Sequence, residues 1–571
     1  MHHLEKDLIP APKLLRLPGG EFEWEHLVEE EVIDSSLEPE MYRLRVADGK
    51  IQLTASGRRG IHLARQTLRQ IHLCTGKTCP ELEIEDKPDF GVRGYMLDIS
   101  RCKVPKMEQM FRLVDLLSLF KFNQLQLYTE HTFAYVGHEN VWRDSSPMTP
   151  DDIRELRDYC ADRFIELVPN QNAFGHMERW LKHAQYEPIA ECPDGFMHPI
   201  SGWRATGSVL CPGQEAIDFA DGLLEQLVPC FHGDWIHLGC DEPWELGQGR
   251  SIERVEELGR HEVYRQHVCR LSDLAEKYGK RMLFWSDELR DHPSGITEFP
   301  ESMIPVAWGY EADHPFDPEC EAFARASRDF LVAPGDSSWN SFSGRLDTCG
   351  PNLEKAARAA KEHGAMGLLM TSWGDMGHQQ VWPSRVAGLV GFAAITWNQG
   401  EIHPGILEHA LNRFVFMDDS GALGKFWVDF GRLDSHIPIK LKPENSSFPY
   451  DALYAPVSKL RPALRKQSAD LFFHANSWLE HCEKELARAK PGSSDRTWLL
   501  AESQLAVEMT RVGLLKAEAV LKGEDFHTAF ENWDSILETF QACWRYRNRE
   551  GGLSESLERL RQAADNNHLA K

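Results

Sequence analysis

The sequence predicts an α/β protein, a (β/α)8 TIM barrel with a small N-terminal α/β domain and a C-terminal helical domain. Its 571 residues exceed what one hydrophobic core holds, so several domains are expected. Between residues 92 and 398, eight short apolar runs alternate with amphipathic helical patterns. No glycine-rich phosphate loop follows the first run, which disfavours a doubly wound open sheet. The expected domains are 1–90, 91–402 and 403–571.

The N-terminal region has the pattern of a small sheet with one helix. Residues 42–55 alternate between apolar and polar side chains around a turn at Asp48-Gly49, which is typical of a hairpin. The segment 59–73 follows with helical spacing. Its expected buried side consists of Ile61, Leu63, Leu68 and Ile71.

The barrel strands are expected where runs of apolar, β-branched and aromatic residues lie between turn signals. These runs are 94–99, 124–129, 165–169, 235–239, 281–285, 304–308, 330–334 and 367–372. Helical patterns separate most of them, such as 106–120, 149–163 and 252–279. Eight strand–helix units in about three hundred residues are typical of this barrel.

The region after residue 403 has helical patterns alone. Three long amphipathic segments lie at 463–489, 496–522 and 526–549, and a Pro-Gly-Ser-Ser break at 491–494 separates the first two. Their Trp, Phe and Leu side chains are expected to be core or interface. We therefore expect a helical domain packed on the barrel.

Composition narrows the class of partner. The formal charge of −25 disfavours nucleic acid and anionic membrane surfaces as partners. No apolar run is long enough to span a membrane, and the first residues do not resemble a signal peptide. The 13 cysteines have no CxxC pair, so free thiols are expected. These observations favour a cytoplasmic protein.

Polar and aromatic residues gather where the predicted strands end, and this is the face on which barrel enzymes carry their chemistry. Asp241 and Glu242 are adjacent after the fourth strand. Adjacent acids take different roles only where their environments separate their pKa values. Aromatic faces suit the C–H face of a pyranose. The other strand ends contribute Glu130, His176, Trp285, Trp308, Tyr310, Asn340, Trp373 and Asp375.

Five ordered motifs resemble glycoside hydrolase family 20, the β-N-acetylhexosaminidases. They are VRGYMLDISR (92–101), KFNQLQLY (121–128), AFGHMERW (173–180), His237-Leu-Gly-Cys-Asp-Glu242 and TSWGDMGH (371–378). The resemblance covers about residues 40 to 400, including the small domain that precedes the barrel in that family. The helical tail lies outside it.

The resemblance implies a role for each matching residue. Glu242 is expected to be the general acid/base, and Asp241 the partner of the substrate acetamido group, with His176 supporting both. Arg93 and Asp375 are expected to bind sugar hydroxyls, with an ion pair to Asp98 as the alternative for Arg93. Trp285, Trp308 and Trp373 would wall the pocket.

The sequence departs from the family pattern in three places. Cys240 replaces a glycine of the signature, and Glu130 stands where an aspartate is common. The Tyr that follows the seventh strand in many members is missing, so either Asn340 or Tyr310 is expected to bind the acetamido carbonyl.

The expected function is exo-acting, retaining removal of terminal β-linked GlcNAc or GalNAc from glycans, with no metal and no cofactor. Glycosidases normally place two carboxyls on opposite sides of the bond, which neighbours on one strand end cannot easily do. The substrate acetamido oxygen would then serve as the nucleophile. Two alternatives stay open. One is a non-catalytic carbohydrate-binding barrel. The other is a metal-dependent hydrolase with the ligands His131, His176, His237 and Asp241.

Overall fold

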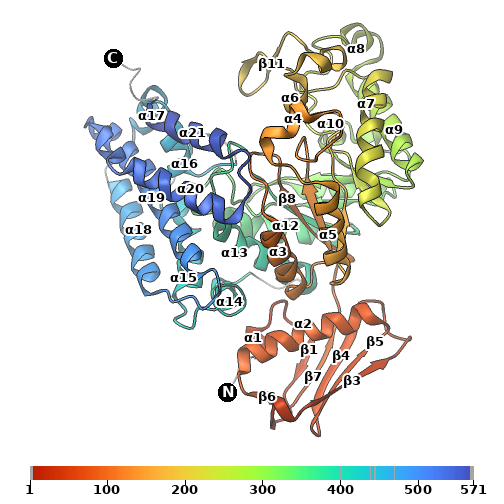
Figure 1. Cartoon of the computed structure of the whole chain (residues 1–571), viewed down its shortest axis with the longest axis vertical. Coiled ribbons are helices and arrows are strands. Elements are labelled where there is room, and N and C mark those ends of the chain that lie inside the picture. The colour runs from red at the N-terminus through yellow and green to blue at the C-terminus, as the bar shows by residue number, and fades with distance from the viewer. Residues whose placement is uncertain (1–3, 399–401, 438, 443–444, 469, 566–571) are drawn as a thin grey trace.

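The computed structural model describes residues 4–398, 402–437, 439–442, 445–468 and 470–565. Figure 1 shows a small N-terminal sheet at one end, a central barrel, and helices packed along one side of the barrel. This arrangement confirms the predicted α/β fold class. The described part of the chain has no helix that is both long and apolar enough to cross a membrane.

The N-terminal sheet has five strands in the order β1-β7-β4-β5-β3. The strands β4 (Tyr42–Ala47) and β5 (Lys50–Ala55) form the predicted hairpin, and its turn residues Asp48 and Gly49 have φ angles of 54° and 73°. Helix α2 (Arg58–Thr75) covers the sheet, and its four predicted apolar residues are buried. The other strands are β1 (Leu14–Arg16), β3 (Val28–Ile33) and β7 (Leu82–Asp86).

A buried polar cluster joins this sheet to the floor of the barrel. The carboxylate of Asp86 accepts hydrogen bonds from Tyr42 Oη at 2.5 Å and from Trp397 Nε1 at 2.8 Å. Lys121 Nζ lies 3.1 Å from the same carboxylate. Burial lowers the pKa of Lys121, opposed by the Asp86 charge. Removing one partner of a buried ion pair costs roughly 3–5 kcal/mol, so this cluster fixes the sheet against the barrel.

The barrel contains all eight predicted strands. Neighbouring strands run parallel in the order β10-β9-β8-β17-β16-β15-β14-β13. A bridge between Asn170 and His237 brings the two ends of this sheet together. The strands are β8 (Val92–Asp98), β9 (Gln124–Tyr128), β10 (Glu166–Val168), β13 (Trp235–His237), β14 (Arg281–Trp285), β15 (Ile304–Trp308), β16 (Leu331–Ala333) and β17 (Gly367–Ser372).

Helices surround the barrel. One predicted segment, 252–279, is divided into α8 (Ile252–Leu258) and α9 (Arg260–Lys277). Gly259, with a φ of 86°, makes the break, because glycine adopts this conformation at little cost. The remaining long barrel helices are α3 (Met107–Leu119), α5 (Pro150–Ala161), α7 (Gln214–Leu227), α11 (Phe316–Arg325), α12 (Leu346–Glu362) and α13 (Val386–Asn398).

The C-terminal region is helical, as predicted. Helix α19 (Arg496–Lys522) has the predicted bounds, whereas the segment 526–549 starts with a 3-10 turn before α20 (Trp533–Arg547). Residues 399–401, at the predicted end of the barrel domain, lie outside the described residues, and the domain boundaries stay a prediction. The other α-helices are α14 (Pro404–Ala410), α15 (Ala422–Phe430), α16 (Phe448–Tyr454), α17 (Val457–Leu464), α18 (Asp470–Arg488) and α21 (Leu553–Asp565).

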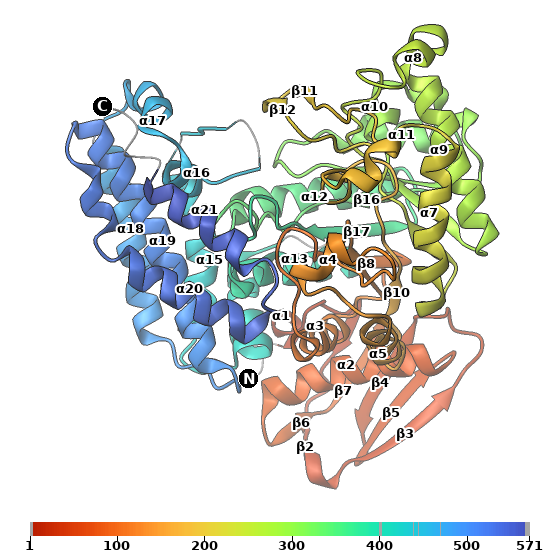
Figure 2. The ribbon, with the colours of Figure 1, turned by 45° about the horizontal axis from the view of Figure 1, so that its top comes forward.

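Helix α21 reaches back to the barrel. Figure 2 shows this dark blue helix beside α19 and α20, with one end directed toward the barrel. Ser556 Oγ donates to the carbonyl oxygen of Gly377 at 2.7 Å, and Glu555 forms an ion pair with Arg179 at 2.8 Å. Gly377 follows β17, and Arg179 lies in the short helix α6 (Glu178–Leu181) in the connection after β10, so α21 belongs to the wall around the carboxyl ends of the barrel strands.

Candidate active site

The acid pair Asp241 and Glu242 stands where the chain leaves β13 in a strained turn. Gly239, Cys240 and Glu242 have φ angles of 72°, 75° and 49°. A Cβ at Gly239 would also collide with Oδ1 of Asn172. Cys240 adopts the left-handed conformation despite its Cβ, which costs an ordinary residue about 1–2 kcal/mol. Backbone strain of this kind gathers at functional sites.

His176 links the two carboxylates. Its Nε2 lies 3.1 Å from Oδ2 of Asp241 and 3.7 Å from Oε2 of Glu242. Burial disfavours the imidazolium, but the charge and hydrogen bond of Asp241 outweigh burial and raise the pKa of His176 to about 10. Burial also opposes ionisation of Asp241, yet the His176 charge holds the pKa of that carboxyl below its usual value.

Glu242 has the opposite tendency. Burial raises the pKa of its carboxyl, His176 opposes this effect, and the Asp241 charge adds to it, with a net upward shift. The side chain is about one third exposed, so it remains accessible from solvent. The pair therefore combines one carboxyl that ionises readily with one that retains its proton to higher pH, as an acid/base catalyst requires.

The loop that carries His176 packs tightly on the acid pair. It follows β10, and Ala173 N donates to the carbonyl oxygen of Leu238 at 3.1 Å. Gly175 lies so close to the neighbouring turn that a Cβ there would collide with the carbonyl oxygen of Asp241. The glycine therefore permits the approach that brings His176 to Asp241.

Asp287 holds Glu242 from the other side. Its Oδ2 accepts a hydrogen bond of 3.0 Å from the backbone N–H of Glu242, and Trp308 Nε1 donates to its Oδ1 at 3.4 Å. Burial and the nearby Asp241 charge raise the pKa of Asp287 well above its usual value. This side chain connects the general-acid position to the aromatic wall.

The aromatic residues form a continuous wall above the barrel interior. Trp308 stacks on Tyr310 with ring centroids 5.4 Å apart and an interplanar angle of 25°. The Trp373 ring lies 6.4 Å from Tyr310 and 6.0 Å from Trp285. Trp285, Tyr310 and Trp373 are buried and Trp308 is half-buried. Such a wall suits the C–H face of a pyranose.

Arg101 is the cation on the side of the site that Glu130 and Asp375 form. Its Nη1 lies 3.1 Å from Oδ2 of Asp98, and its Nε lies 3.1 Å from Oε1 of Glu130. The guanidinium stands over the rings of Tyr128 and Trp373, at 4.5 Å and 5.1 Å. Burial raises the pKa of Glu130, with the Arg101 charge opposing this shift. A guanidinium and a carboxyl side by side are suited to binding sugar hydroxyls.

The expectation for Arg93 was wrong. This residue lies at the amino end of β8, away from the acid pair, and its Nη1 is 2.7 Å from Oε2 of Glu40 in the N-terminal region. Its Nε donates to the carbonyl oxygen of Lys121 at 2.9 Å. The alternative pairing with Asp98 is also wrong, because Asp98 pairs with Arg101. A residue at the amino end of a barrel strand serves stability.

Asn340 and Asp375 close the hydroxyl side. Asn340 Nδ2 donates to Oδ2 of Asp375 at 3.4 Å and to the carbonyl oxygen of Asn445 at 3.1 Å. Both Asn340 and Asp375 have positive φ angles, of 48° and 41°. Burial raises the pKa of Asp375, and the Arg101 charge opposes this shift.

The structure thus gathers the predicted site residues other than Arg93 at the carboxyl ends of the strands. Sequence reasoning gave no role to Arg101 or Asp287. Both lie just after a barrel strand, and Arg101 ends the motif at 92–101. Because functional residues of barrel enzymes follow the strands, these positions alone could have identified both residues as candidates. The gathered residues are Glu130, His176, Asp241, Glu242, Trp285, Trp308, Tyr310, Asn340, Trp373 and Asp375.

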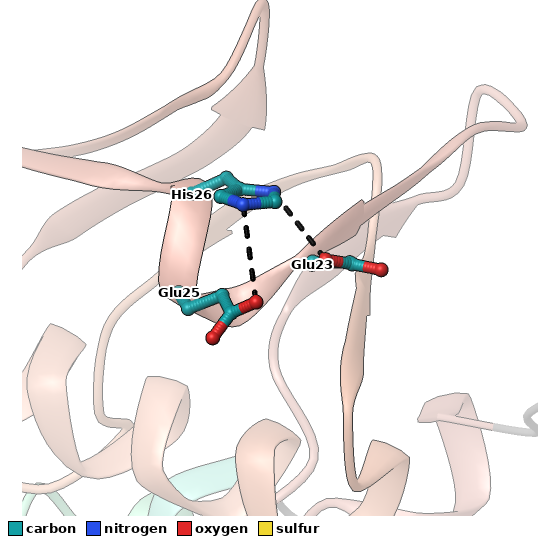
Figure 3. Close-up of side chains that lie close together, drawn as sticks. All are labelled: Glu23, Glu25 and His26. Carbon is teal, nitrogen blue, oxygen red and sulfur yellow. Dashed lines mark ion pairs between the residues drawn. The ribbon is translucent and has the colours of Figure 1, made fainter.

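The four residues of the metal alternative do not form a ligand set. Within the described ranges, the groups whose ligand atoms lie close enough to share an ion are Glu23 with Glu25 and His26, and a second group at 317, 362 and 363. Figure 3 shows the first group in the N-terminal region, where His26 is 3.4 Å from Glu23 and 3.8 Å from Glu25. Neither group belongs to the acid-pair site.

Comparison with family models matches two parts of the chain. Residues 90–339 match the model described as "Glycosyl hydrolase family 20, catalytic domain". Residues 26–87 match "Glycosyl hydrolase family 20, domain 2". Together they include four of the five strands of the N-terminal sheet, most of the barrel and the acid pair.

Curated relatives with low sequence identity are also hexosaminidases. A β-hexosaminidase of Porphyromonas gingivalis is 26% identical over 285 residues, which cover 44% of this chain and 36% of that protein. Hexosaminidase D of Bos taurus is 26% identical over 222 residues, covering 37% and 60% of the two chains. The matched region therefore spans less than two thirds of either relative.

Solved structures share the fold. A family 20 exo-β-N-acetylglucosaminidase from Vibrio harveyi superimposes with a TM-score of 0.57 at 18% identity, over 70% of this chain and 74% of that chain. A chitobiase from Flavobacterium johnsoniae gives a TM-score of 0.59 at 15% identity, over 98% and 100% of the two chains. The second match extends through the C-terminal helices.

Proposed function

The chain belongs to glycosyl hydrolase family 20, and we propose that it is an exo-acting, retaining β-N-acetylhexosaminidase that uses substrate-assisted catalysis. Its substrate would be a glycan or glycoconjugate with terminal β-linked GlcNAc or GalNAc. One observation carries this proposal. Asp241 and Glu242 both face the same nitrogen of His176, at 3.1 Å and 3.7 Å, and so lie on one side of the pocket.

Two carboxyls on one side cannot act as the opposed pair of an ordinary retaining glycosidase, because the acid and the nucleophile must flank the anomeric bond. In substrate-assisted enzymes the 2-acetamido oxygen is the nucleophile, and the protein needs one acid/base and one group that steadies the acetamido nitrogen. Glu242 and Asp241 have the environments for these two roles.

In the first step the acetamido carbonyl oxygen bonds to C1 while the bond from C1 to the leaving oxygen breaks. Glu242 gives its proton to that oxygen, and the sugar becomes an oxazolinium ion. Oδ1 of Asp241 is buried and has no hydrogen-bond partner among the described residues, so it is free to accept the N–H of this ion. A charge-assisted bond there would stabilise the intermediate.

In the second step a water molecule attacks C1 and gives a proton to Glu242. The bond from C1 to the acetamido oxygen breaks, the acetamido group is restored, and the configuration at C1 is retained. Closure of the pocket by Trp285, Trp308 and Trp373 would strengthen these electrostatic contacts by excluding solvent.

Tyr310 is our choice for the residue that binds the acetamido carbonyl. The amide nitrogen of Asn340 is already bonded to Asp375 and to the carbonyl oxygen of Asn445. Burial in the aromatic wall raises the pKa of Tyr310, its contacts with Trp373 and Thr371 oppose this shift, and the Asp241 charge adds to it, so its hydroxyl lies within the field of the acid pair. Tyr310→Phe should therefore lower kcat more than Asn340→Ala.

The proposal is tested with 4-nitrophenyl glycosides. We expect turnover of the β-N-acetylglucosaminide or β-N-acetylgalactosaminide and none of the plain β-glucoside. Asp241→Asn should slow all leaving groups, and Glu242→Gln should slow poor leaving groups most. A thiazoline analogue of the intermediate should bind more tightly than free GlcNAc in the wild type, an advantage that Asp241→Asn removes. Equal turnover of the glucoside, or thiazoline binding that does not depend on Asp241, contradicts the proposal.

We also propose a reducing compartment, such as the cytoplasm, as the location. All 13 cysteines are free thiols, and most are buried. Free thiols persist where glutathione and thioredoxin keep cysteines reduced. Fractionation of source cells with an antibody to the protein tests this location.

A further inference from the structure

A second cavity opens beside the hydroxyl side of the acid-pair site. Its volume is about 370 Å³, and Arg101, Glu130 and Asp375 form its inner end. Among the described lining residues there is neither Glu242 nor any tryptophan of the aromatic wall. His176 also lines the cavity, so the cavity is continuous with the acid-pair site.

The outer end of this cavity comes from distant parts of the chain. Arg179 and Lys182 follow the His176 loop, while Glu555 and Arg559 project from α21. The ion pair of Arg179 with Glu555, at 2.8 Å, joins the two sides. The stem of Arg559 packs over Gly377, where an added Cβ would lie 2.7 Å from its Cδ. Gly377 is two positions after Asp375 in the sequence, so this contact places Arg559 near Asp375.

The outer wall has cations that its carboxylates do not neutralise. Arg179 is paired with Glu555, and Glu178 lies 3.6 Å from Arg204. Lys182 has no ion pair in the part of the chain that the structure describes, and Arg559 reaches only the already paired Glu555, at 3.9 Å. The outer end thus has three cations, Arg179, Lys182 and Arg559, against the two carboxylates of Glu178 and Glu555.

We propose that this cavity is a subsite for an anionic substituent on the terminal N-acetylhexosamine, bound by Lys182 and Arg559. The inference rests on the proposed function, which places C1 of the sugar at Glu242. The ring edge with the hydroxyl groups then faces Arg101 and Asp375, and a group carried on that edge enters the cavity. Sulfate esters, phosphate esters and carboxylates share the required chemistry of a compact anion with several acceptor oxygens.

A neutral substituent would not use this arrangement. An unmodified terminal sugar ends at the hydroxyl-binding residues and leaves the outer cations unused. A sulfate or phosphate placed there gains charge-assisted hydrogen bonds from two cations that lack a carboxylate of their own. The subsite thus selects modified sugars without altering the acid pair.

The test compares 4-nitrophenyl β-N-acetylglucosaminide with its 3-O-, 4-O- and 6-O-sulfated forms and its 6-O-phosphate. We expect at least one anionic form to be cleaved with a kcat/KM equal to or above that of the unmodified sugar. The double variant Lys182→Met/Arg559→Met keeps both aliphatic stems and removes both charges. It should lower the ratio of kcat/KM for the anionic form over the unmodified form by roughly tenfold. Comparison of sulfate with phosphate identifies the preferred anion.

Two controls accompany the variant. Lys466→Met removes an exposed cation in the connection after α17 and should leave the ratio unchanged. Raising the salt concentration should lower the wild-type ratio, because exposed charges are screened. Cleavage of the unmodified sugar alone, or a ratio that the double variant does not change, overturns the inference and leaves the proposed function intact. Cleavage of no N-acetylhexosaminide rejects the proposed function and the inference with it.

Discussion

The Nε2 atom of His176 lies 3.1 Å from Oδ2 of Asp241, and this contact sets the charges of the whole acid pair. The imidazolium lowers the pKa of Asp241 and also opposes the upward shift of the Glu242 pKa. The same imidazolium therefore lowers the pKa of both carboxyls. The proposed mechanism needs an ionised Asp241 and a protonated Glu242, so the pH profile should be bell-shaped.

His176→Gln should move the whole profile to higher pH. Without the cation the pKa of Asp241 rises, so the acidic limb appears at higher pH, and the pKa of Glu242 rises as well, so the alkaline limb follows. The measurement is kcat/KM against pH. The exposed His232 provides the control, since His232→Gln should leave both limbs in place. Limbs that stay fixed in His176→Gln would show that the imidazole does not set these pKa values.

Gly175→Ala should lower kcat by about a hundredfold with little loss of folded protein. The added Cβ collides with the carbonyl oxygen of Asp241 and displaces the acid pair, and misplacement by about 1 Å costs roughly that factor. Gly222→Ala in α7 is the matched control, because nothing lies within 4 Å of its added Cβ. Steady-state kinetics and a melting curve on both variants check this prediction, and full activity in Gly175→Ala contradicts it.

Cys240→Gly should preserve activity, and Cys240→Val should not. The φ angle of 75° suits glycine, whereas a β-branched side chain is strongly disfavoured there. The buried position also leaves no room for added methyl groups, so Val should lower the melting temperature by several degrees. Equal melting temperatures for the two variants would argue against strain at this turn.

Substitution of Arg101 should affect catalysis, whereas substitution of Arg93 should affect stability. Arg101→Ala removes the guanidinium beside Glu130 and should raise KM and lower kcat/KM strongly. Arg93→Ala breaks a buried pair with Glu40 at the opposite end of β8, so it should lower the melting temperature while the folded enzyme keeps its kcat/KM. Loss of substrate affinity in folded Arg93→Ala would contradict the placement of the two residues.

The barrel could be predicted because each strand has a recognisable local sequence pattern. Runs such as 304–308 and 367–372 are apolar and bounded by turns, and they coincide with β15 and β17. Gly259 illustrates the limit of periodicity, since apolar spacing continues through a residue at which the backbone turns. Periodicity reports which face is buried and does not report a change in helix direction.

The errors at the site are of another kind. Arg93 and Arg101 both lie in the motif at 92–101 and are eight positions apart. Because a strand is extended, this separation is enough to put one at the floor of the barrel and the other at its catalytic face. The role of α21 had no local signal at all. Glu555 meets Arg179 across 376 positions of sequence, and such a contact depends on how the helices pack on the barrel.

The ion pair between Arg179 and Glu555 joins two residues that are synthesised far apart in time. During synthesis the barrel strands leave the ribosome well before α21, and domains generally begin to fold from the N-terminal side. A nascent barrel therefore holds the acid pair while one side of its pocket is still unbuilt. Because Arg559 lies on α21, a protease cut in the connection between α20 and α21 should weaken the proposed recognition of charge, while the acid pair stays on the barrel.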